Sequence, residues 1–145
     1  MIGIGNDHGG YGLKMHIKKL LESKGYEVKD FGCHDTNSVD YPDIALPVCE
    51  SVLSGECECG ILVCGTGIGM SIAANKIKGI RAAHVTDSFS ARMTKMHNNA
   101  NVICLGERIT GCEIASDIVE AYLNAEFEGG RHIARVDKFM AFENK

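Results

Sequence analysis

Short apolar runs alternate along this chain with segments in which apolar residues recur at helical spacing. Each run has the length of a strand, and Ile61–Cys64 is apolar throughout, as expected for a strand that is covered on both faces. The five predicted strands are Met1–Gly5, Glu27–Phe31, Gly60–Cys64, Arg81–Val85 and Asn101–Leu105.

The intervening segments predict helices. One helical face is formed by Leu13, Ile17, Leu20 and Leu21, and Gly25 follows it as a stop signal. Further helices are predicted at Tyr41–Leu53, where Pro47 should interrupt or kink the helix, at Asp87–Met96, and around Ile114, Ile118 and Leu123.

Alternating strands and helices indicate a parallel sheet with right-handed crossovers, hence a three-layer α/β/α sandwich. The length of 145 residues fits one domain, 1–145. After Gly129–Gly130 comes a tail, 131–145, in which Ile133, Val136, Phe139 and Met140 share one helical face. The tail is either a frayed end or an arm that docks on something else.

The charge balance narrows the class of partner. With 15 basic and 19 acidic residues the net charge is −4, and no run of Lys or Arg occurs, so neither nucleic acid nor an anionic membrane is an expected partner. No apolar run approaches the roughly 20 residues that span a bilayer. Seven cysteines in a domain of this size are expected to be reduced thiols, and we expect a cytoplasmic protein.

Two loops carry the candidate chemistry. The first predicted strand is followed by Asn6–Gly10 and the third by Gly65–Gly69, which Cys64 precedes. Ligands of open α/β sheets bind at the carboxyl ends of the strands, beside the point where the strand order reverses. In the order 2-1-3-4-5 these loops are neighbours, and one crevice holds a carboxylate, an imidazole, a thiol and a glycine-rich helix start.

The glycine loop matches no standard nucleotide motif. Met70 stands where a dinucleotide fingerprint needs glycine, although Asp87 lies near the required distance, and Thr66 stands where a P-loop needs lysine. Successive amides at a helix start still form a cradle for an oxyanion or a phosphate. The alternative is tight packing of strand on helix with no ligand.

Cys64 precedes that helix start, where the positive end of the helix dipole favours a thiolate, so it is a candidate base or nucleophile. No arginine follows it between Gly65 and Lys76, which disfavours a cysteine phosphatase. The expected buried hydrophobes are Cys33, Cys49, Cys104 and Cys112. Cys57 and Cys59 lack zinc spacing, and no metal site is predicted.

Among the histidines, His97 is distinctive because it is predicted in a polar loop, beside Asn98, just before the last strand. It is a candidate general acid. The alternative, a surface residue without a catalytic role, is equally open. His84 is predicted to lie in the strand core. The arginines that could pair with a phosphate are Arg108, Arg131 and Arg135.

Taken together, these residues resemble the type B ribose-5-phosphate isomerases, whose family also contains the galactose-6-phosphate isomerase subunits. The segments that carry the resemblance are Asp7–Gly10, Asp40–Pro42, Cys64–Gly69, Ser71–Asn75, Gly79–Ala82, His97–Asn98, Gly106–Arg108, and Glu128–His132 with Arg135. They cover nearly the whole chain. The resemblance implies a sheet order of 2-1-3-4-5 and a homodimer with shared active sites, and some family members pair further into tetramers.

The resemblance also implies a role for each candidate residue. Cys64 would be the base, assisted by Thr66, and His97 would open the sugar ring. The amides of Gly65, Gly67, Ile68 and Gly69 would hold the enediolate. Other substrate contacts would come from Asp7, Asn98 and Tyr41, and the phosphate would be held by His8, Arg108, Arg131 and Arg135, some of them from the partner chain. One branch of the family uses a glutamate in place of the cysteine, but Met70–Asn75 contains no acidic residue.

The resemblance implies a reaction that needs neither a metal nor an organic cofactor, because a proton moves between adjacent carbons with no net redox change. The expected substrate is ribose 5-phosphate. The alternatives are allose 6-phosphate, galactose 6-phosphate or a tetrulose phosphate, and a phospho-sugar-binding protein without turnover.

Overall fold

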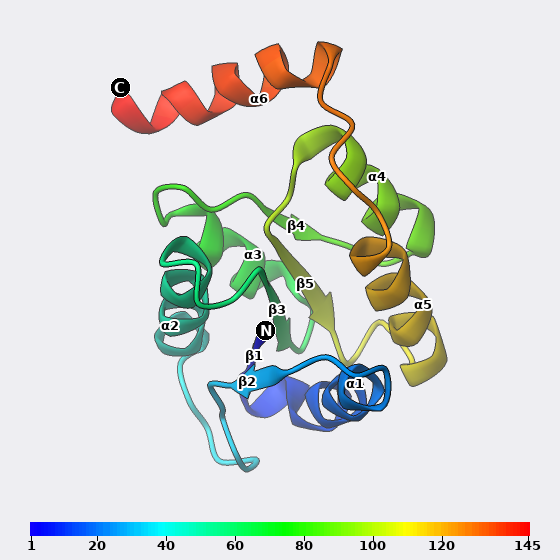
Figure 1. Cartoon of the computed structure of the whole chain (residues 1–145). Helices are drawn as coiled ribbons and strands as arrows, with labels where there is room; N and C mark the ends of the chain where they lie inside the picture. Colours follow the sequence, from blue (N-terminus) through cyan, green and yellow to red (C-terminus); the bar gives the residue numbers. More distant parts are fainter.

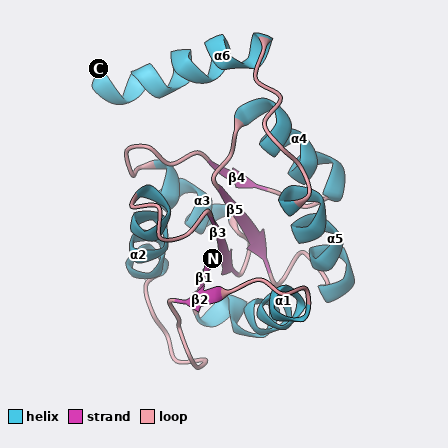
Figure 2. Ribbon diagram, in the orientation of Figure 1, coloured by secondary structure: helices cyan, strands magenta, loops and turns pink.

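A five-stranded parallel sheet forms the centre of the protein, whose computed structural model describes residues 1–145 (Figures 1 and 2). Each strand agrees with a predicted run to within one residue at either end. The strands are β1 (Ile2–Asn6), β2 (Val28–Asp30), β3 (Cys59–Cys64), β4 (Ala82–His84) and β5 (Val102–Gly106).

The sheet order is β2-β1-β3-β5-β4, so the expected order 2-1-3-4-5 is wrong at its last two positions. The physical reason is burial. β5 is an apolar strand buried at all five positions, whereas β4 has only three residues, none of them fully buried. A strand of the second kind suits an edge, and β5 therefore lies between β3 and β4. The predicted neighbours β1 and β3 do pair, in parallel, from Ile2 and Cys59 onwards.

Helices cover both faces of the sheet, which confirms the three-layer sandwich (Figure 2). The helices α1 (Tyr11–Ser23), α4 (Ser88–Asn98) and α5 (Cys112–Leu123) contribute to one buried cluster, and α2 (Tyr41–Leu53) and α3 (Ile68–Asn75) to the other. A one-turn helix, η1 (His8–Gly10), precedes α1. The predicted interruption at Pro47 is wrong, because α2 continues through it. None of the helices combines the length and the apolar character that crossing a bilayer requires.

The tail forms an ordered helix, α6 (Arg131–Met140), followed by a short turn, η2 (Ala141–Asn144). Val136 is buried, and the Glu143 carboxylate accepts a hydrogen bond from the Gly79 amide at 2.9 Å. Much of the arm's apolar surface stays uncovered, since Ile133 is 49% and Phe142 63% exposed. In Figure 1 the arm lies beyond the amino ends of the strands.

A buried ion pair ties α1 to β2. Lys14 is fully buried, and its Nζ lies 2.7 Å from Asp30 Oδ2. Burial acts to raise the pKa of Asp30, but hydrogen bonds from Lys14 and from the Gly32 amide outweigh it and leave this pKa below its usual value.

Candidate active site

The loops that follow β1 and β3 meet at the carboxyl edge of the sheet. Asp7 accepts a hydrogen bond from the Gly9 amide at 2.8 Å, and the Asp7 amide donates to the Val63 carbonyl of β3 at 3.2 Å. A Cβ on Gly9 would lie 3.1 Å from the Gly65 nitrogen, so the two loops are in contact. The predicted contact between the two loops is therefore confirmed.

Cys64 ends β3 directly before the second of these loops, with 5% of its surface exposed. Its Sγ accepts a hydrogen bond from the Gly67 amide at 3.1 Å. Gly67 adopts φ +80°, a conformation that favours glycine, and this turns its amide back toward the thiol. The Thr66 hydroxyl accepts from the Ile68 amide at 3.3 Å. The start of α3 thus supplies one amide donor to the Cys64 sulfur and a second to the Thr66 hydroxyl.

The corrected strand order brings a cation to the same loop. Because β5 pairs with β3, Cys64 lies opposite Gly106, and the Arg108 amide donates to the Gly65 carbonyl at 3.0 Å. A Cβ on Gly65 would lie 3.5 Å from Arg108 Cδ and Nε, so the arginine side chain covers the loop.

Tyr41 and His8 border the loop on the side of β1. The Tyr41 ring packs on Gly69, where a Cβ would lie 2.9 Å from the ring carbon Cζ. His8 Nδ1 accepts a hydrogen bond from the Val39 amide at 3.3 Å. The carboxyl edge therefore gathers ten of the predicted residues: Asp7, His8, Tyr41, Cys64, Gly65, Thr66, Gly67, Ile68, Gly69 and Arg108.

The other four predicted residues lie at the amino edge. His97 and Asn98 belong to the last turn of α4, not to a loop as predicted, and Arg131 and Arg135 lie on α6. The chain that follows α4 meets β3 at its beginning, where the Gly60 amide donates to the Asn101 carbonyl at 3.0 Å. From Gly60 to Cys64 the strand advances about 13 Å. One chain does not bring these four residues to its own Cys64.

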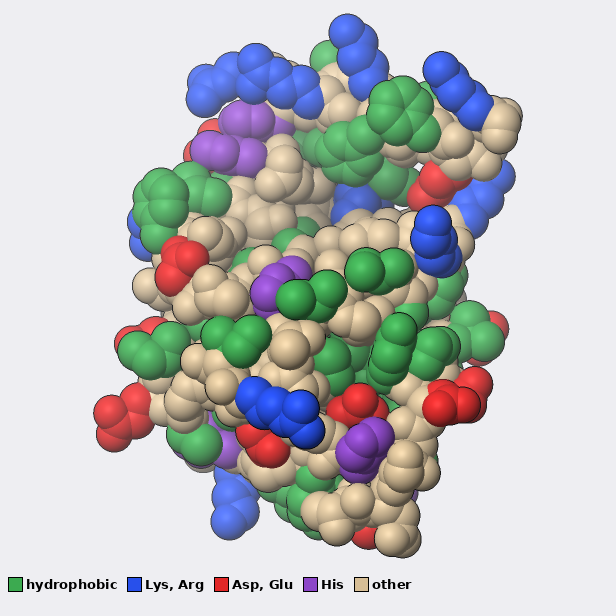
Figure 3. Space-filling model, turned by 180° about the vertical axis from the view of Figure 1, so that it is seen from behind, with side chains coloured by type: hydrophobic (Ala, Val, Ile, Leu, Met, Phe, Trp, Pro, Cys, Tyr) green, Lys and Arg blue, Asp and Glu red, His purple; other side chains and the backbone are tan.

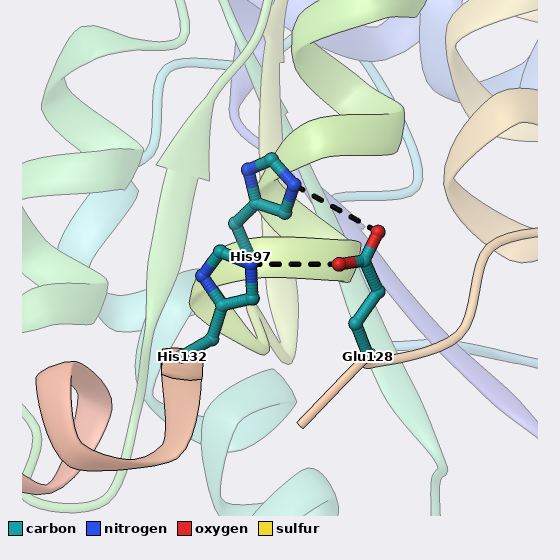
Figure 4. A group of neighbouring side chains, drawn as sticks. All are labelled: His97, Glu128 and His132. Atoms are coloured by element: carbon teal, nitrogen blue, oxygen red, sulfur yellow. Dashed lines mark ion pairs between the residues drawn. The ribbon is translucent and has the colours of Figure 1, made fainter. Parts of the chain in front are cut away.

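At the amino edge, His97 belongs to a second cluster of polar side chains (Figure 4). Its ring stacks on His132 with centroids 4.3 Å apart, and Glu128 faces both rings. Burial lowers the pKa of His132, and the charges of His97 and Arg131 add to this effect, whereas Glu128 opposes it. Glu128 and His132 belong to a segment that carries the family resemblance, but the sequence analysis predicted no role in the site for either residue. No local pattern gave a signal for this pair, because Glu128 precedes α6 and is not part of the helix that carries His132.

Two other predictions are wrong. His84 is an exposed residue rather than part of the strand core, and a Cβ on Gly67 would lie 2.8 Å from its Cδ2, so it borders the glycine loop. Cys112 is exposed at the start of α5, whereas Cys33, Cys49 and Cys104 are buried as predicted. Burial raises the pKa of Cys49 to about 12, with the charge of Glu50 adding to the effect.

The glycine loop offers little to a dinucleotide. Met70, at the position where a fingerprint needs glycine, is fully buried and packs with Ala74 and Cys104. At the start of α3 the Gly67 amide instead donates to a thiol, and the Arg108 side chain lies beside Gly65, a combination that suits a small anion.

Comparison with known proteins identifies the family. The sequence model of the ribose/galactose isomerase family matches residues 2–139 of this chain. The chain belongs to the ribose/galactose isomerase family. A solved structure of Clostridium thermocellum ribose-5-phosphate isomerase B has a TM-score of 0.97 and 58% identity, covering 99% of this chain and 97% of that one.

Two curated relatives in this family carry different substrate names. Escherichia coli ribose-5-phosphate isomerase B is 45% identical over 99% of this chain and 97% of its own length. Pectobacterium atrosepticum D-erythrulose-4-phosphate isomerase is 43% identical over 99% of this chain and 95% of its own. The same architecture therefore serves isomerases named for sugar phosphates of different length.

Proposed function

We propose that this chain is an aldose–ketose isomerase that interconverts ribose 5-phosphate and ribulose 5-phosphate in the pentose phosphate pathway. The observation that carries the proposal is the position of Cys64, whose Sγ lies 3.1 Å from the Gly67 amide at the open start of α3. A base beside preorganised amides is what proton abstraction next to a carbonyl needs. Relatives named ribose-5-phosphate isomerase B support the choice of substrate.

In the proposed reaction the Cys64 thiolate takes the proton from C2 of the open-chain aldose. The electron pair of the C–H bond forms the enediolate, and negative charge builds on O1. We place this charge beside the amides at the start of α3, from Gly65 to Gly69, which would stabilise it as it develops. Cys64 then returns the proton to C1 while a proton passes from O2 to O1, assisted by the Thr66 hydroxyl. No atom or electron is gained or lost.

The ring must open before this step. We assign ring opening to His97, which donates a proton to the ring oxygen and accepts one from the hydroxyl on C1. Asp7, Asn98 and Tyr41 hold and border the sugar. The phosphate is placed among His8, Arg108, Arg131 and Arg135, three of which offer guanidinium groups for charge-assisted hydrogen bonds.

We further infer that the active site is shared between two chains of a homodimer. His97 and the arm lie about 13 Å or more along the sheet from Cys64 of the same chain, so a second copy must supply them. The surface offers room for that contact, because Ile68 and Ile72 at the start of α3 are 48% and 58% exposed. Figure 3 shows Lys and Arg side chains gathered along the edge that the arm forms.

This arrangement gives residues 131–145 a function as an arm that docks on the partner subunit. Two-fold dimers are the commonest oligomers, and the symmetry would build two equal sites from one kind of contact. Dimers of this kind can pair further into tetramers. The seven unpaired thiols suit a reducing cytoplasm.

A four-carbon sugar phosphate is the second candidate substrate, favoured by the relative named D-erythrulose-4-phosphate isomerase. The catalytic residues would be the same, because chain length is sensed by the depth of the pocket. Allose 6-phosphate and galactose 6-phosphate, which have six carbons, test whether the pocket accepts a longer sugar. A panel of aldose phosphates with four to six carbons, ranked by kcat/KM, decides among them.

The proposed function is tested by Cys64→Ala. General-base catalysis contributes roughly 10² to 10⁴ in rate, so the variant should lose at least a hundredfold in kcat. Exchange of the C2 proton with solvent, followed by NMR in D₂O, should be lost with it. Cys112→Ser is the matched control, because it removes an exposed thiol that is not part of the glycine loop and should leave both rates unchanged. Exchange at the normal rate in Cys64→Ala would assign the base elsewhere.

A further inference from the structure

The cluster at the end of α4 contains three potential ligands that form no hydrogen bonds with one another. His97 Nε2 lies 3.9 Å from Glu128 Oε1, and His132 Nε2 lies 3.5 Å from Glu128 Oε2. One nitrogen or oxygen of each residue lies within 4.8 Å of the other two. Figure 4 shows both rings turned toward the one carboxylate.

His132 supplies the observation that points to a missing partner. The residue is only 5% exposed, and its buried Nε2 has no hydrogen-bond partner. A buried polar atom without a partner is costly, and nearly all such atoms in folded proteins are satisfied by protein, water or an ion. The Nε2 faces the Glu128 carboxylate, so whatever satisfies it must lie between the two.

We propose that His97, Glu128 and His132 bind a divalent transition metal ion of the zinc type. Two imidazoles and one carboxylate suit zinc, nickel or copper, whereas magnesium and calcium prefer oxygen ligands. Atoms about 2.1 Å from a tetrahedral ion are roughly 3.4 Å apart, close to the shorter separations seen here. Three protein ligands leave a fourth position for water or substrate.

Closing the set requires movement of the two more exposed side chains only. The side chains of His97 and Glu128 are 35% and 40% exposed, whereas that of His132 is 6% exposed. The imidazole planes are now only 13° apart, so His97 must turn about its Cβ–Cγ bond to direct Nε2 at a shared ion. The buried ring is thus the fixed ligand, and the two others close on the ion.

This ion would inhibit the enzyme. The inference rests on the proposed function in one respect, the assignment of ring opening to His97. An imidazole that has given its lone pair to a metal cannot accept a proton from the sugar. Zinc should therefore slow turnover of the cyclic substrate, the chelator EDTA should restore it, and saturating sugar phosphate should compete with the metal.

Direct metal binding is the deciding experiment. Zn²⁺ is titrated into the purified dimer by calorimetry, with Glu128→Gln as the test variant because Glu128 is exposed and the fold should tolerate the change. Glu126→Gln is the matched control, since Glu126 is an exposed carboxylate two residues away that is outside the cluster. We expect one ion per chain, an affinity at least tenfold weaker in Glu128→Gln, and no change in Glu126→Gln.

Thiols are the competing ligands, and Co²⁺ distinguishes them. Cobalt bound to thiolate absorbs strongly in the near ultraviolet, whereas cobalt bound to imidazole and carboxylate does not. Equal affinity in wild type and Glu128→Gln, or thiolate absorption that disappears in Cys112→Ser, would overturn the proposal. Because binding is measured without substrate, a chain that binds zinc at this cluster but lacks isomerase activity would refute the proposed function and leave the metal site standing.

Discussion

A mixture of two inactive variants tests whether the active site is built from two chains. Cys64→Ala removes the proposed base at the carboxyl edge of the sheet, and Arg135→Ala removes a proposed phosphate ligand from the exposed arm at the other edge. Each homodimer has one defect in both of its sites. In a mixed dimer with shared sites, both defects fall in the same site and the other site is intact.

The expected recovery follows from the symmetry. When equal amounts of the two variants are unfolded and refolded together, random pairing makes about half of the dimers mixed, and each holds one intact site of two, so roughly a quarter of wild-type activity returns. The assay is formation of ribulose 5-phosphate, normalised to wild type that has been refolded in the same way. Each variant refolded alone sets the background.

The matched control uses Arg108→Ala in place of Arg135→Ala. The Arg108 side chain covers the Cys64 loop of its own chain, so a mixed dimer of Cys64→Ala and Arg108→Ala has one defect in each site and should stay inactive. Recovery of activity with the Arg135 variant but not with the Arg108 variant would show that each site takes Arg108 from the chain that supplies Cys64 and Arg135 from the other chain. No recovery in either mixture would refute the shared site and require that the arm fold back onto its own chain.

Two further predictions concern backbone geometry and charge. Gly67→Ala places a Cβ at φ +80° and 2.8 Å from a ring carbon of His84, so kcat should fall roughly a hundredfold as the Gly67 amide leaves the Cys64 sulfur. The control is Gly55→Ala, at φ +82° with open space around the new Cβ, which should cost about 1 kcal/mol of stability and no activity. Equal kcat values in the two variants would refute this prediction. Because the folded-state pKa of Asp30 lies below its unfolded value, the Lys14 pair stabilises the fold above about pH 4 and this contribution is lost as the pH falls through the folded-state pKa. The free energy of unfolding, measured with urea from pH 7 to 3, should show this loss in wild type. Lys14→Met should lower the free energy of unfolding by about 3 kcal/mol at pH 7 and remove the loss at acid pH. An unchanged dependence of the unfolding free energy on pH in Lys14→Met would refute the assignment.

The strands could be read from the sequence because each is a continuous apolar run between turn signals. Their order could not be read in full. Placing β5 between β3 and β4 depends on how deeply each strand is buried. Arg81 and His84 make the fourth run less apolar than the fifth, but two polar residues do not by themselves assign a strand to the edge. The error mattered for the site, since only the true order sets Gly106 opposite Cys64 and brings Arg108 to the loop.

Candidate residues at the carboxyl edge were predictable because they lie within a few positions of a strand end, and topology brings strand ends together. The contact of His97 with Glu128 was not predictable in this way. This contact joins two residues that are 31 positions apart in the chain. Glu128 lies between α5 and α6, and no local pattern specifies the course of the chain there. The exposure of Cys112 has a similar origin, because a helix start can face either the core or solvent.

The proposed division of the site between two edges would also explain why one chain contains two polar clusters rather than one. A base needs a place where charge on the substrate is stabilised by amides, and the parallel sheet offers this only at its carboxyl edge, where helices begin. Ring opening needs an imidazole that can give and take protons, and the end of α4 holds His97 with solvent on one side. The two-fold axis of the proposed dimer would join the two requirements without a longer chain. It follows that a substitution that weakens the contact between subunits, even far from any substrate atom, should abolish both sites together and not halve the activity.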